Sequence, residues 1–440
     1  MKHGFARTMG FLMAAVLLLA MVLPAQAATT GKSGPFSYTL KGDGTASITG
    51  FDWSQYKDDE NIVIPQMIDG YTVTDIGSSA FARGKGELDT EYHEGTYFAK
   101  VIIPGTVQKV REKAFFNSGI GYFTIPASVK TIEIAAFCTG TLRNVTVDNN
   151  NENYASIDGS LYSKKDKELL ALAVETTSIP NGIISIGEYS CVNGLIKLTK
   201  VKFPSSIEII KNYAFSNGED GDGKYRYTDR NGEGTIRFDH VKSIGDYAFI
   251  SLRASGVTIY FGSTLSEIGR NAFSGARLKA LHLEQCTKVT QIPWAAFANF
   301  RASEKTRLPS SITEIGGMAF ANTLIYEFAF DHMKPITIGS RAFEKTGGVL
   351  DVDDNFFSRV ESIGEYAFRG ARFTLNRNAH DIKDVITLPS SCTFIGKGAF
   401  DSKWTAFKVQ PGSYAEEWAQ ENGYEYDNGT KAKADTSWLN

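Results

Sequence analysis

Residues Val360–Phe368 read VESIGEYAF and residues Val241–Phe249 read VKSIGDYAF, so the two segments differ at only two places. Both contain Ala-Phe with an aliphatic residue five places before the Phe. This pattern occurs eleven times, mostly 22 to 25 residues apart, with Ile at the aliphatic place in ten copies and Val110 in the other. The motif is therefore one part of a repeat and not a site used twice. The motif phenylalanines are Phe81, Phe115, Phe137, Phe215, Phe249, Phe273, Phe297, Phe320, Phe343, Phe368 and Phe400.

Proline provides a second, independent marker of the repeat. Five prolines lie eleven residues before a motif Phe, namely Pro104, Pro126, Pro204, Pro309 and Pro389. Pro180 predicts a further copy at Cys191, where Ile186 and Gly187 stand at the expected places. The chain therefore contains twelve copies, and Cys191 replaces the Phe in one of them.

A period near 23 residues with apolar side chains at fixed places is the pattern of a solenoid. In LTKVKFPSSIEIIKNYAF (198–215), VKF alternates as a short strand that Pro204 ends, because proline cannot donate to a strand ladder. The four-residue step from Ile210 to Ala214 is typical of one helical turn. We predict an α/β repeat fold, a solenoid of about twelve short strand–turn–helical-turn coils.

Two positions of the motif lead to further expectations. The Gly that follows the motif Ile is replaced by Arg111, Glu133, Lys211 and Pro293 in other copies. A position that accepts proline has φ near −65°, so we expect no positive φ there. In VESIGEYAF the apolar residues are predicted core contacts, and Glu361, Glu365 and Tyr366 are positions free to vary.

The repeats closely resemble the BspA-like bacterial leucine-rich repeat family. The matching phrases are VIIPGTVQKVREKAF (101–115), FTIPASVKTIEIAAF (123–137), LPSSITEIGGMAF (308–320) and LPSSCTFIGKGAF (388–400). The resemblance covers roughly residues 36–427. It implies a secreted or surface-exposed protein linked to adhesion, and it brings no catalytic motif with it.

The resemblance and the repeat together suggest a division of the chain. Residues 28–72 form an N-terminal strand or hairpin cap, and residues 73–410 form the solenoid. The segment 147–173 resembles the hairpin insertion of the family, and 411–427 resembles its terminal capping element. The polar segment 428–440 is expected to be a flexible tail.

The first 27 residues have the pattern of a secretory signal peptide. A basic start, MKHGFAR, precedes the apolar run FLMAAVLLLAMVL, and AQA fits a small-residue cleavage site. The run is short for a membrane span, so we expect no membrane insertion after cleavage. The formal net charge of −3 offers no electrostatic case for nucleic acid binding.

Cysteine and histidine give little sign of chemistry. Cys191 and Cys392 stand at core places of the repeat and are predicted to be apolar core residues, and Cys138 follows a motif Phe. These three cysteines and Cys286 are all predicted to be free. The histidines are scattered, and no P-loop or Gly-x-Ser-x-Gly motif occurs. The acidic stretches 351–362 and 218–234 lack the Gly or Glu that an EF-hand requires. We therefore expect no enzyme activity, no metal and no cofactor.

Binding is expected on the outward side chains of successive strands, because a solenoid forms an extended face. Aromatic residues are enriched at protein contacts. The long loops 82–98, 217–235 and 369–384 are alternative sites, since loops can carry function that the scaffold does not. The predicted binding residues are Lys100, Ile102, Tyr122, Thr124, Asn144, Lys200, Lys202 and His282.

These features predict a secreted or cell-surface, non-catalytic binding or adhesion protein. Its partner would be a protein or glycan on a host or neighbouring cell, and the chain would act as a monomer. Two alternatives stay open at this point. One is a scaffold subunit of a surface assembly, which a flat apolar patch would favour. The other is a hydrolase with its site in the insertions, which convergent carboxylates with perturbed pKa would favour.

Overall fold

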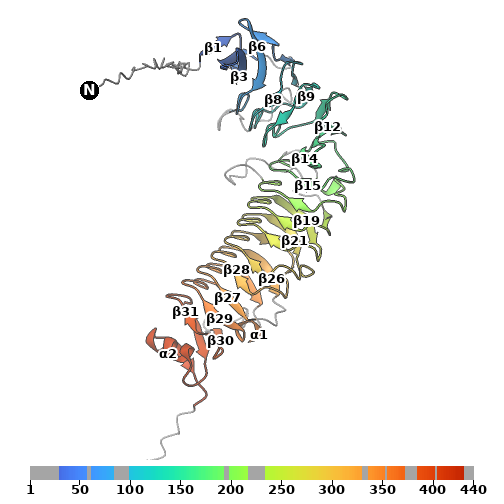
Figure 1. Ribbon diagram of the computed structural model, residues 1–440. Coiled ribbons are helices and arrows are strands. Elements are labelled where there is room, and N and C mark those ends of the chain that lie inside the picture. The colour runs from blue at the N-terminus through green and yellow to red at the C-terminus, as the bar shows by residue number, and fades with distance from the viewer. Residues whose placement is uncertain are drawn as a thin grey trace, which may run out of the picture.

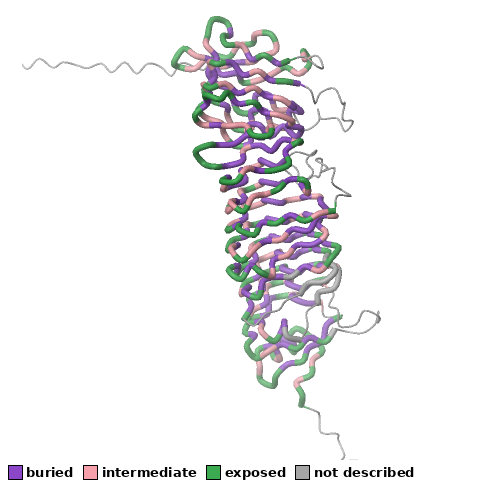
Figure 2. Tube along the Cα trace, turned by 90° about the vertical axis from the view of Figure 1, so that its right-hand side faces the viewer, coloured by how far each residue is buried: buried purple, intermediate pink, exposed green. Residues whose placement is uncertain are grey.

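The computed structural model is an elongated rod of stacked coils with a cap at each end (Figure 1). Buried residues run along its whole length, and exposed residues lie at the corners of the coils (Figure 2). The predicted signal peptide and most of the three long loops lie outside the described residues. The structure describes residues 29–56, 61–83, 99–192, 198–216, 233–329, 335–351, 354–371, 384–401 and 404–430.

One side of the rod, the long-strand face, is built from the strand that precedes the proline in each coil. These strands pair in parallel with those of neighbouring coils, and their side chains alternate between the core and solvent. The strands are β4 (Ile62–Val63), β7 (Lys100–Ile102), β9 (Tyr122–Ile125), β11 (Asn144–Val147), β17 (Gly234–Phe238), β19 (Arg253–Phe261), β21 (Arg277–His282), β23 (Arg301–Ala302), β24 (Thr306–Arg307), β26 (Leu324–Ala329), β28 (Gly347–Asp351), β30 (Asp384–Thr387) and β32 (Thr405–Lys408).

A second side, the short-strand face, contains the motif Ile of each coil. The strands here are mostly two residues long and pair in parallel from coil to coil. Their second residue is buried in nearly every coil, as the motif predicts. They are β8 (Lys109–Val110), β10 (Thr131–Ile132), β15 (Ser185–Ile186), β16 (Ile209–Ile210), β18 (Ser243–Ile244), β20 (Glu267–Ile268), β22 (Gln291–Ile292), β25 (Glu314–Ile315), β27 (Ile336–Ile338), β29 (Val360–Ile363) and β31 (Phe394–Ile395).

The third side, the turn edge, carries Ala-Phe and is not helical, so the predicted helical turns are not confirmed. The residue two places before the motif Phe has φ between 53° and 62° in all twelve copies. This left-handed residue stops a helix from continuing and turns the following N–H groups toward the next coil. Phe249 N, for example, donates to Ala272 O at 2.7 Å. Tyr366 is such a residue (φ 57°), so its backbone is more constrained than the motif suggested.

The position after the motif Ile behaves as predicted. No residue at this place has a positive φ, whether it is Gly or one of its replacements. Glycine occurs at this position because the backbones of adjacent coils approach each other closely there. A Cβ on Gly269 would lie 2.4 Å from Asp246 N of the preceding coil.

The left-handed conformation restricts which residues are tolerated at exposed positions such as Ser79 (φ 55°). We expect Ser79→Val to lower the free energy of unfolding by about 1–2 kcal/mol relative to Ser79→Gly, because a β-branched residue is disfavoured at positive φ. Urea unfolding followed by circular dichroism measures the difference. Equal stability of the two variants would contradict the assignment of backbone strain to this position.

The motif phenylalanines form a stack along the core. Consecutive rings from Phe215 to Phe400 lie nearly parallel, with centroids 4.8 to 5.3 Å apart. A shorter stack joins Phe81, Phe115 and Phe137. Cys191 stands fully buried between the two stacks. Large side chains thus fill each coil and contact the coils on both sides.

All four cysteines are free, as predicted, and all four are buried. Burial raises the pKa of the thiols of Cys191 and Cys286 to about 12 and that of Cys392 to about 11. They are therefore protonated at neutral pH and act as apolar core residues.

An antiparallel insertion divides the rod into two hydrophobic cores. It consists of β12 (Tyr154–Ile157), β13 (Ser160–Ser163) and β14 (Glu168–Ala171), and β14 continues in parallel to β15. Leu161 and Ala171 belong to the core on the N-terminal side, whereas Tyr162 and Leu169 belong to the core on the C-terminal side. The hairpin is therefore a layer across the rod that contacts both cores.

Each end of the rod is covered. At the N-terminal end an antiparallel meander joins β6, which pairs in parallel with β8. At the C-terminal end, α2 (Tyr414–Glu421) is capped by Ser413 and packs Trp418 against Phe400 and Phe407. The remaining elements are β1 (Thr30–Ser33), β2 (Phe36–Leu40), β3 (Thr45–Phe51), η1 (Trp53–Gln55), β5 (Met67–Ile68), β6 (Tyr71–Ile76), η3 (Leu198–Lys200), α1 (Asp354–Phe357) and β33 (Glu425–Asp427).

Candidate binding surface

The predicted residues of the N-terminal coils meet in rows on the long-strand face. Strand register places Lys100 beside Tyr122, and Tyr122 beside Asn144. Adjacent parallel strands lie about 4.8 Å apart, so the cation, the phenol and the amide form one continuous row. Lys100 is exposed, and Tyr122 and Asn144 are half-buried. The row therefore combines groups that can make both polar and aromatic contacts.

A second row runs parallel to the first. Ile102 pairs with Thr124 on one side and with Val63 on the other. Val63 is 57% exposed, which extends an apolar strip beside the polar row. The sequence analysis did not name Val63, because the coil that contains it lacks the proline marker at the expected distance from Phe81.

The two predicted lysines of the next coil are placed differently. Lys202 is exposed and makes a single parallel bridge with Ser178. Lys200 ends the 3-10 helix η3 and does not belong to a strand, contrary to the expected alternation. The neighbouring Leu198 and Val201 belong to the core on the C-terminal side of the hairpin, whereas Val101 beside Lys100 belongs to the other core. Among the described residues, no series of paired strands joins these lysines to the row of Lys100.

His282 belongs to a separate row further along the face. Its ring stacks on Tyr260 with centroids 4.2 Å apart, and the Arg237 guanidinium lies 4.8 Å from the other side of the Tyr260 ring. His282 Nδ1 and Glu284 Oε1 are 3.0 Å apart. The Tyr260 ring therefore has both faces covered and presents mainly its edge to a partner.

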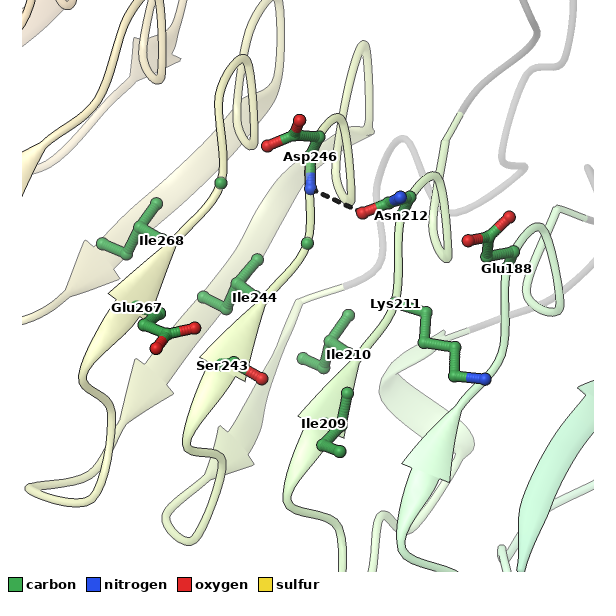
Figure 3. Close-up of a pocket in the computed structure, with 12 residues that line it drawn as sticks. Glu188, Ile209, Ile210, Lys211, Asn212, Ser243, Ile244, Asp246, Glu267 and Ile268 are labelled. Carbon is green, nitrogen blue, oxygen red and sulfur yellow. Dashed lines mark hydrogen bonds between the residues drawn. The ribbon is translucent and has the colours of Figure 1, made fainter. Parts of the chain in front are cut away.

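A depression lies at the corner of the short-strand face, where no binding residue was predicted (Figure 3). Its volume is about 440 Å³. Ile209, Ser243 and Glu267 line it from adjacent strands, and Gly245 and Gly269 leave it hollow because they lack side chains. A smaller depression of about 190 Å³ adjoins it and shares Glu188 and Lys211.

Most polar groups of this depression are engaged by neighbouring coils. Asn212 Oδ1 accepts from Asp246 N at 2.9 Å, and Asp246 Oδ1 accepts from Arg270 N at 2.7 Å. Lys211 Nζ lies 2.6 Å from Glu168 Oε2. Burial raises the pKa of Glu188, with the Glu168 charge adding to the shift and Lys211 opposing it. The depression is thus best explained as a by-product of the glycine corners.

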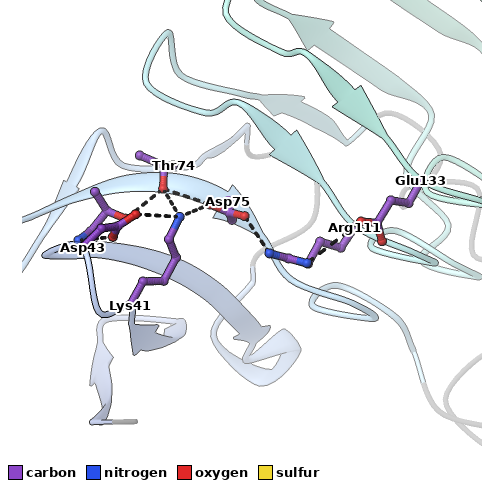
Figure 4. A network of polar contacts seen from close by, with 7 residues as sticks. Lys41, Asp43, Thr74, Asp75, Arg111 and Glu133 are labelled. Atoms are coloured by element: carbon purple, nitrogen blue, oxygen red, sulfur yellow. Dashed lines mark hydrogen bonds and ion pairs between the residues drawn. The ribbon is translucent and has the colours of Figure 1, made fainter. Parts of the chain in front are cut away.

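A polar network ties the N-terminal cap to the first coils (Figure 4). Asp75 is 1% exposed, and its carboxylate lies 2.6 Å from Lys41 Nζ and 3.0 Å from Arg111 Nη2. Thr74 Oγ1 also donates to Asp75 at 2.9 Å. Burial alone would raise the pKa of Asp75, but the hydrogen bonds from Lys41 and Thr74 and the charges of Lys41 and Arg111 together lower it. The network is structural, because its centre is inaccessible.

Within the described ranges, no three His, Cys, Asp or Glu residues are grouped so that they could hold a metal ion. Most of the acidic stretch 218–234 lies outside those ranges. In the stretch 351–362, residues 352 and 353 lie outside them and the side chains of residues 351, 354 and 355 are not described. None of the described helices is long and apolar enough to cross a bilayer.

Several solved structures are similar to this chain. A leucine rich cell surface protein from Faecalibacterium prausnitzii is 18% identical, with a TM-score of 0.38 over 93% of this chain and 97% of that one. A leucine-rich repeat protein from Bacteroides ovatus is 16% identical, with a TM-score of 0.40 over 90% and 99% of the two chains. The pneumococcal vaccine antigen PcpA is 15% identical, with a TM-score of 0.37 over 91% and 98%.

No curated protein matches this sequence. The profile of the BspA type leucine rich repeat region does match, in six copies, over residues 54–167, 86–220, 224–349 and 336–410. These ranges cover most of the chain and contain the motif phenylalanines that stack in the core. The chain belongs to the BspA type leucine-rich repeat family.

Proposed function

We propose that this protein is a secreted or cell-surface binding protein without catalytic activity. It contacts a protein or glycan on a host or neighbouring cell through the long-strand face, and it acts as a monomer. The observation that carries the proposal is the row of Lys100, Tyr122 and Asn144 on three paired strands. Membership of a leucine-rich repeat family supports a binding role, because a solenoid presents an extended face to a partner.

The composition of this surface suits recognition. The exposed part of the row offers an ammonium group, a phenol and an amide, beside the apolar strip of Val63 and Ile102. Protein-contact surfaces are enriched in aromatic residues and combine polar with apolar groups. A rigid sheet also holds these side chains in place before a partner arrives, which limits the entropy lost on binding.

Binding to a panel of cell-surface proteins and to a glycan array tests the proposal. The chain without residues 1–27 is compared with a variant carrying Lys100→Glu, Tyr122→Ala and Asn144→Ala, the three residues of the row. We expect at least about a tenfold loss of affinity, because charge reversal places like charges against the partner. The matched control is Lys109→Glu, Tyr71→Ala and Asn181→Ala, which makes the same charge change and the same truncations at exposed positions outside the long-strand face.

An equal loss in both triple variants would show that overall charge and not this face governs binding. Unchanged binding by the first variant would reject the long-strand face as the contact surface. Capture of no partner by the unaltered chain would reject the binding function itself.

A further inference from the structure

The smaller depression, of about 190 Å³, has a different origin from the larger one. None of the described residues that line it is glycine. It lies where the short-strand face is interrupted, because β10 is the last strand of its sheet and no described strand pairs with its outer edge. Ile132 N on that edge donates instead to the hydroxyl oxygen of Tyr154 at 2.7 Å. The depression therefore belongs to the joint between the two hydrophobic cores.

We call this depression the joint cleft. Residues 132–134 line it from the last coil before the hairpin layer, and Asp166, Glu168 and Leu170 line it from the hairpin layer. Glu188 and Lys211 of the following coils complete it. These two residues also line the larger depression, and Figure 3 shows them at one end of it. Segments from both sides of the hairpin layer thus converge on one small volume.

The joint cleft has an apolar wall. Ile134 is 50% exposed, and Ile132 and Leu170 are half-buried where they pack against the N-terminal core. Most other copies of the repeat hold a polar residue at the position of Ile134, such as Glu112 and Asp246. The packing of the coils does not call for an apolar side chain at this position. A ligand with an apolar part would cover the surface that Ile134 leaves exposed.

Acidic groups outnumber basic groups in the joint cleft. Its lining has one ammonium group, that of Lys211, which lies 2.6 Å from Glu168 Oε2. Arg111 Nη1 reaches toward the cleft and lies 3.9 Å from Glu133 Oε1, but Arg111 Nη2 lies closer to Asp75, at 3.0 Å. The carboxylates of the lining are those of Glu133, Asp166, Glu168 and Glu188.

Two of these carboxylates have no cation beside them among the described residues. Asp166 accepts a hydrogen bond from the neutral Ser163 Oγ at 2.8 Å and forms no ion pair. Glu188 is half-buried, and its carboxylate forms neither an ion pair nor a hydrogen bond with a described residue. Burial raises the pKa of Glu188, because the cleft solvates its charge less well than water does. A cation is therefore the group that complements this cleft.

We infer that the joint cleft accepts an arginine side chain that projects from a partner protein. Its aliphatic stem lies against Ile132, Ile134 and Leu170. Its guanidinium meets the carboxylates of Asp166 and Glu188. Long cationic side chains commonly bury their stems on apolar surface in this way while the charged end stays with polar groups. The inference rests on the proposed binding function and adds a contact on a second face of the rod.

The size and charge of the cleft favour arginine over other cationic ligands. About 190 Å³ is less than the roughly 300 Å³ of typical small-molecule sites, so the cleft suits one projecting side chain. A guanidinium has five donors in a planar fork and is less strongly hydrated than the ammonium of lysine. It therefore serves two carboxylates at a lower cost in lost hydration. Free arginine carries its own carboxylate, which the acidic lining repels.

Ligand-observed NMR with the chain lacking residues 1–27 tests the inference. Saturation transfer detects weak binding of the probe acetyl-Ser-Arg-Ser-amide, for which we expect a Kd on the order of 1 mM. Three further probes replace the arginine by lysine, by neutral citrulline or by glutamate. We expect weaker binding of the lysine peptide and no detectable binding of the other two. Equal binding of the citrulline peptide, or tighter binding of the lysine peptide, would overturn the assignment to arginine.

The variant Glu188→Gln removes the charge and keeps the shape of the side chain. We expect it to lose at least about fivefold in affinity for the arginine probe. The matched control is Glu314→Gln, which removes a charge at an exposed position of the same face that does not line the cleft. Salt screens that distant charge, so the control is expected to bind within about twofold of the unaltered chain. Equal losses in the two variants would overturn the inference.

A second pair of variants tests the apolar wall. Ile134→Ala removes surface on which the stem lies, so we expect about threefold weaker binding of the arginine probe. The matched control is Ile157→Ala, which makes the same truncation at a side chain that is 43% exposed and does not line the cleft. All four variants are expected to keep the circular dichroism spectrum of the unaltered chain. Unchanged affinity of Ile134→Ala would overturn the assigned position of the stem.

Sedimentation velocity tests a second copy of this chain as the occupant. Self-association that Glu188→Gln abolishes would assign the cleft to a second copy and overturn the inference. If the arginine probe does not bind while the triple variant of the long-strand face still loses its partner, the inference fails and the proposed function stands. If the probe binds while that triple variant keeps its partner, the cleft stands and the long-strand face fails as the contact surface.

Discussion

Replacing Phe297 with Ala is expected to lower the free energy of unfolding by about 3–5 kcal/mol. The ring is fully buried and stacks between Phe273 at 5.3 Å and Phe320 at 5.2 Å. Phe300 contacts it edge-on at 5.7 Å. The truncation leaves a cavity that the coils above and below cannot close, since their own rings are held by further neighbours. The loss therefore includes transfer of the ring, the cavity and the stacking contacts.

Urea unfolding followed by circular dichroism measures this effect. The matched control is Phe394→Ala, which removes the same atoms from a side chain that is 51% exposed. We expect the control to lose less than about 1 kcal/mol, as surface substitutions usually do. Similar losses at Phe297 and Phe394 would contradict the view that the ring stack stabilises the rod.

Replacing Asp75 with Ala is expected to cost about 3 kcal/mol. Removing one partner of a buried ion pair leaves its partners uncompensated, a change that typically costs about 3–5 kcal/mol. Lys41 and Arg111 are 30% and 40% exposed in their side chains, so water can reach both, and the lower end of that range applies. The loss should appear in the unfolding of the N-terminal coils, which the network joins to the cap.

The Asp75 carboxyl is also expected to make the stability of the folded chain depend on pH. The pKa of Asp75 is lower in the folded chain than its ordinary value. Stability from the network is thus fully present above the pKa of the unfolded chain and is lost as the pH falls through the folded pKa. The unaltered chain should lose more stability than Asp75→Asn on acidification. Identical slopes of stability against pH for the two chains would show that Asp75 does not contribute to the pH dependence of stability.

Much of the fold follows from the repeat, because core side chains are constrained by type. Pro180 predicted a coil at Cys191, and that coil is present with its thiol buried where a ring stands elsewhere. Pro293, at the position after the motif Ile, correctly indicated that glycine there is not needed for a positive φ. Features that depend on side-chain size or on the missing N–H of proline can therefore be predicted from residue type.

The turn edge could not be predicted in this way. Its left-handed residue is Ser79 in one coil, Tyr247 in another and Met318 in a third. The conformation is imposed by hydrogen bonds between coils and not by the residue's own preference, so composition gives no sign of it. The four-residue spacing from the motif Ile to Ala therefore resembles that of a helical turn, although the segment forms its hydrogen bonds with the next coil.

The candidate surface was predicted in part. The alternation of VKF-like strands placed Lys100, Tyr122 and Asn144 outward, and strand register brings them together. The alternation could not show that Lys200 ends a 3-10 helix, because a three-residue strand and a 3-10 turn can have the same composition.

The hairpin layer between the two cores has a mechanical consequence. The ring stacks stop on either side of it, and Cys191 stands in the gap. Across this layer the rod is held by the pairing of β14 with β15, by side chains of β13 and β14 that face opposite ways, and by a small cluster of Ala135, Cys138 and Val192. We expect strain to concentrate at this joint when the rod is pulled or bent by its ends, because the aromatic stack does not continue through it. The joint would then yield while the long C-terminal stack stays intact.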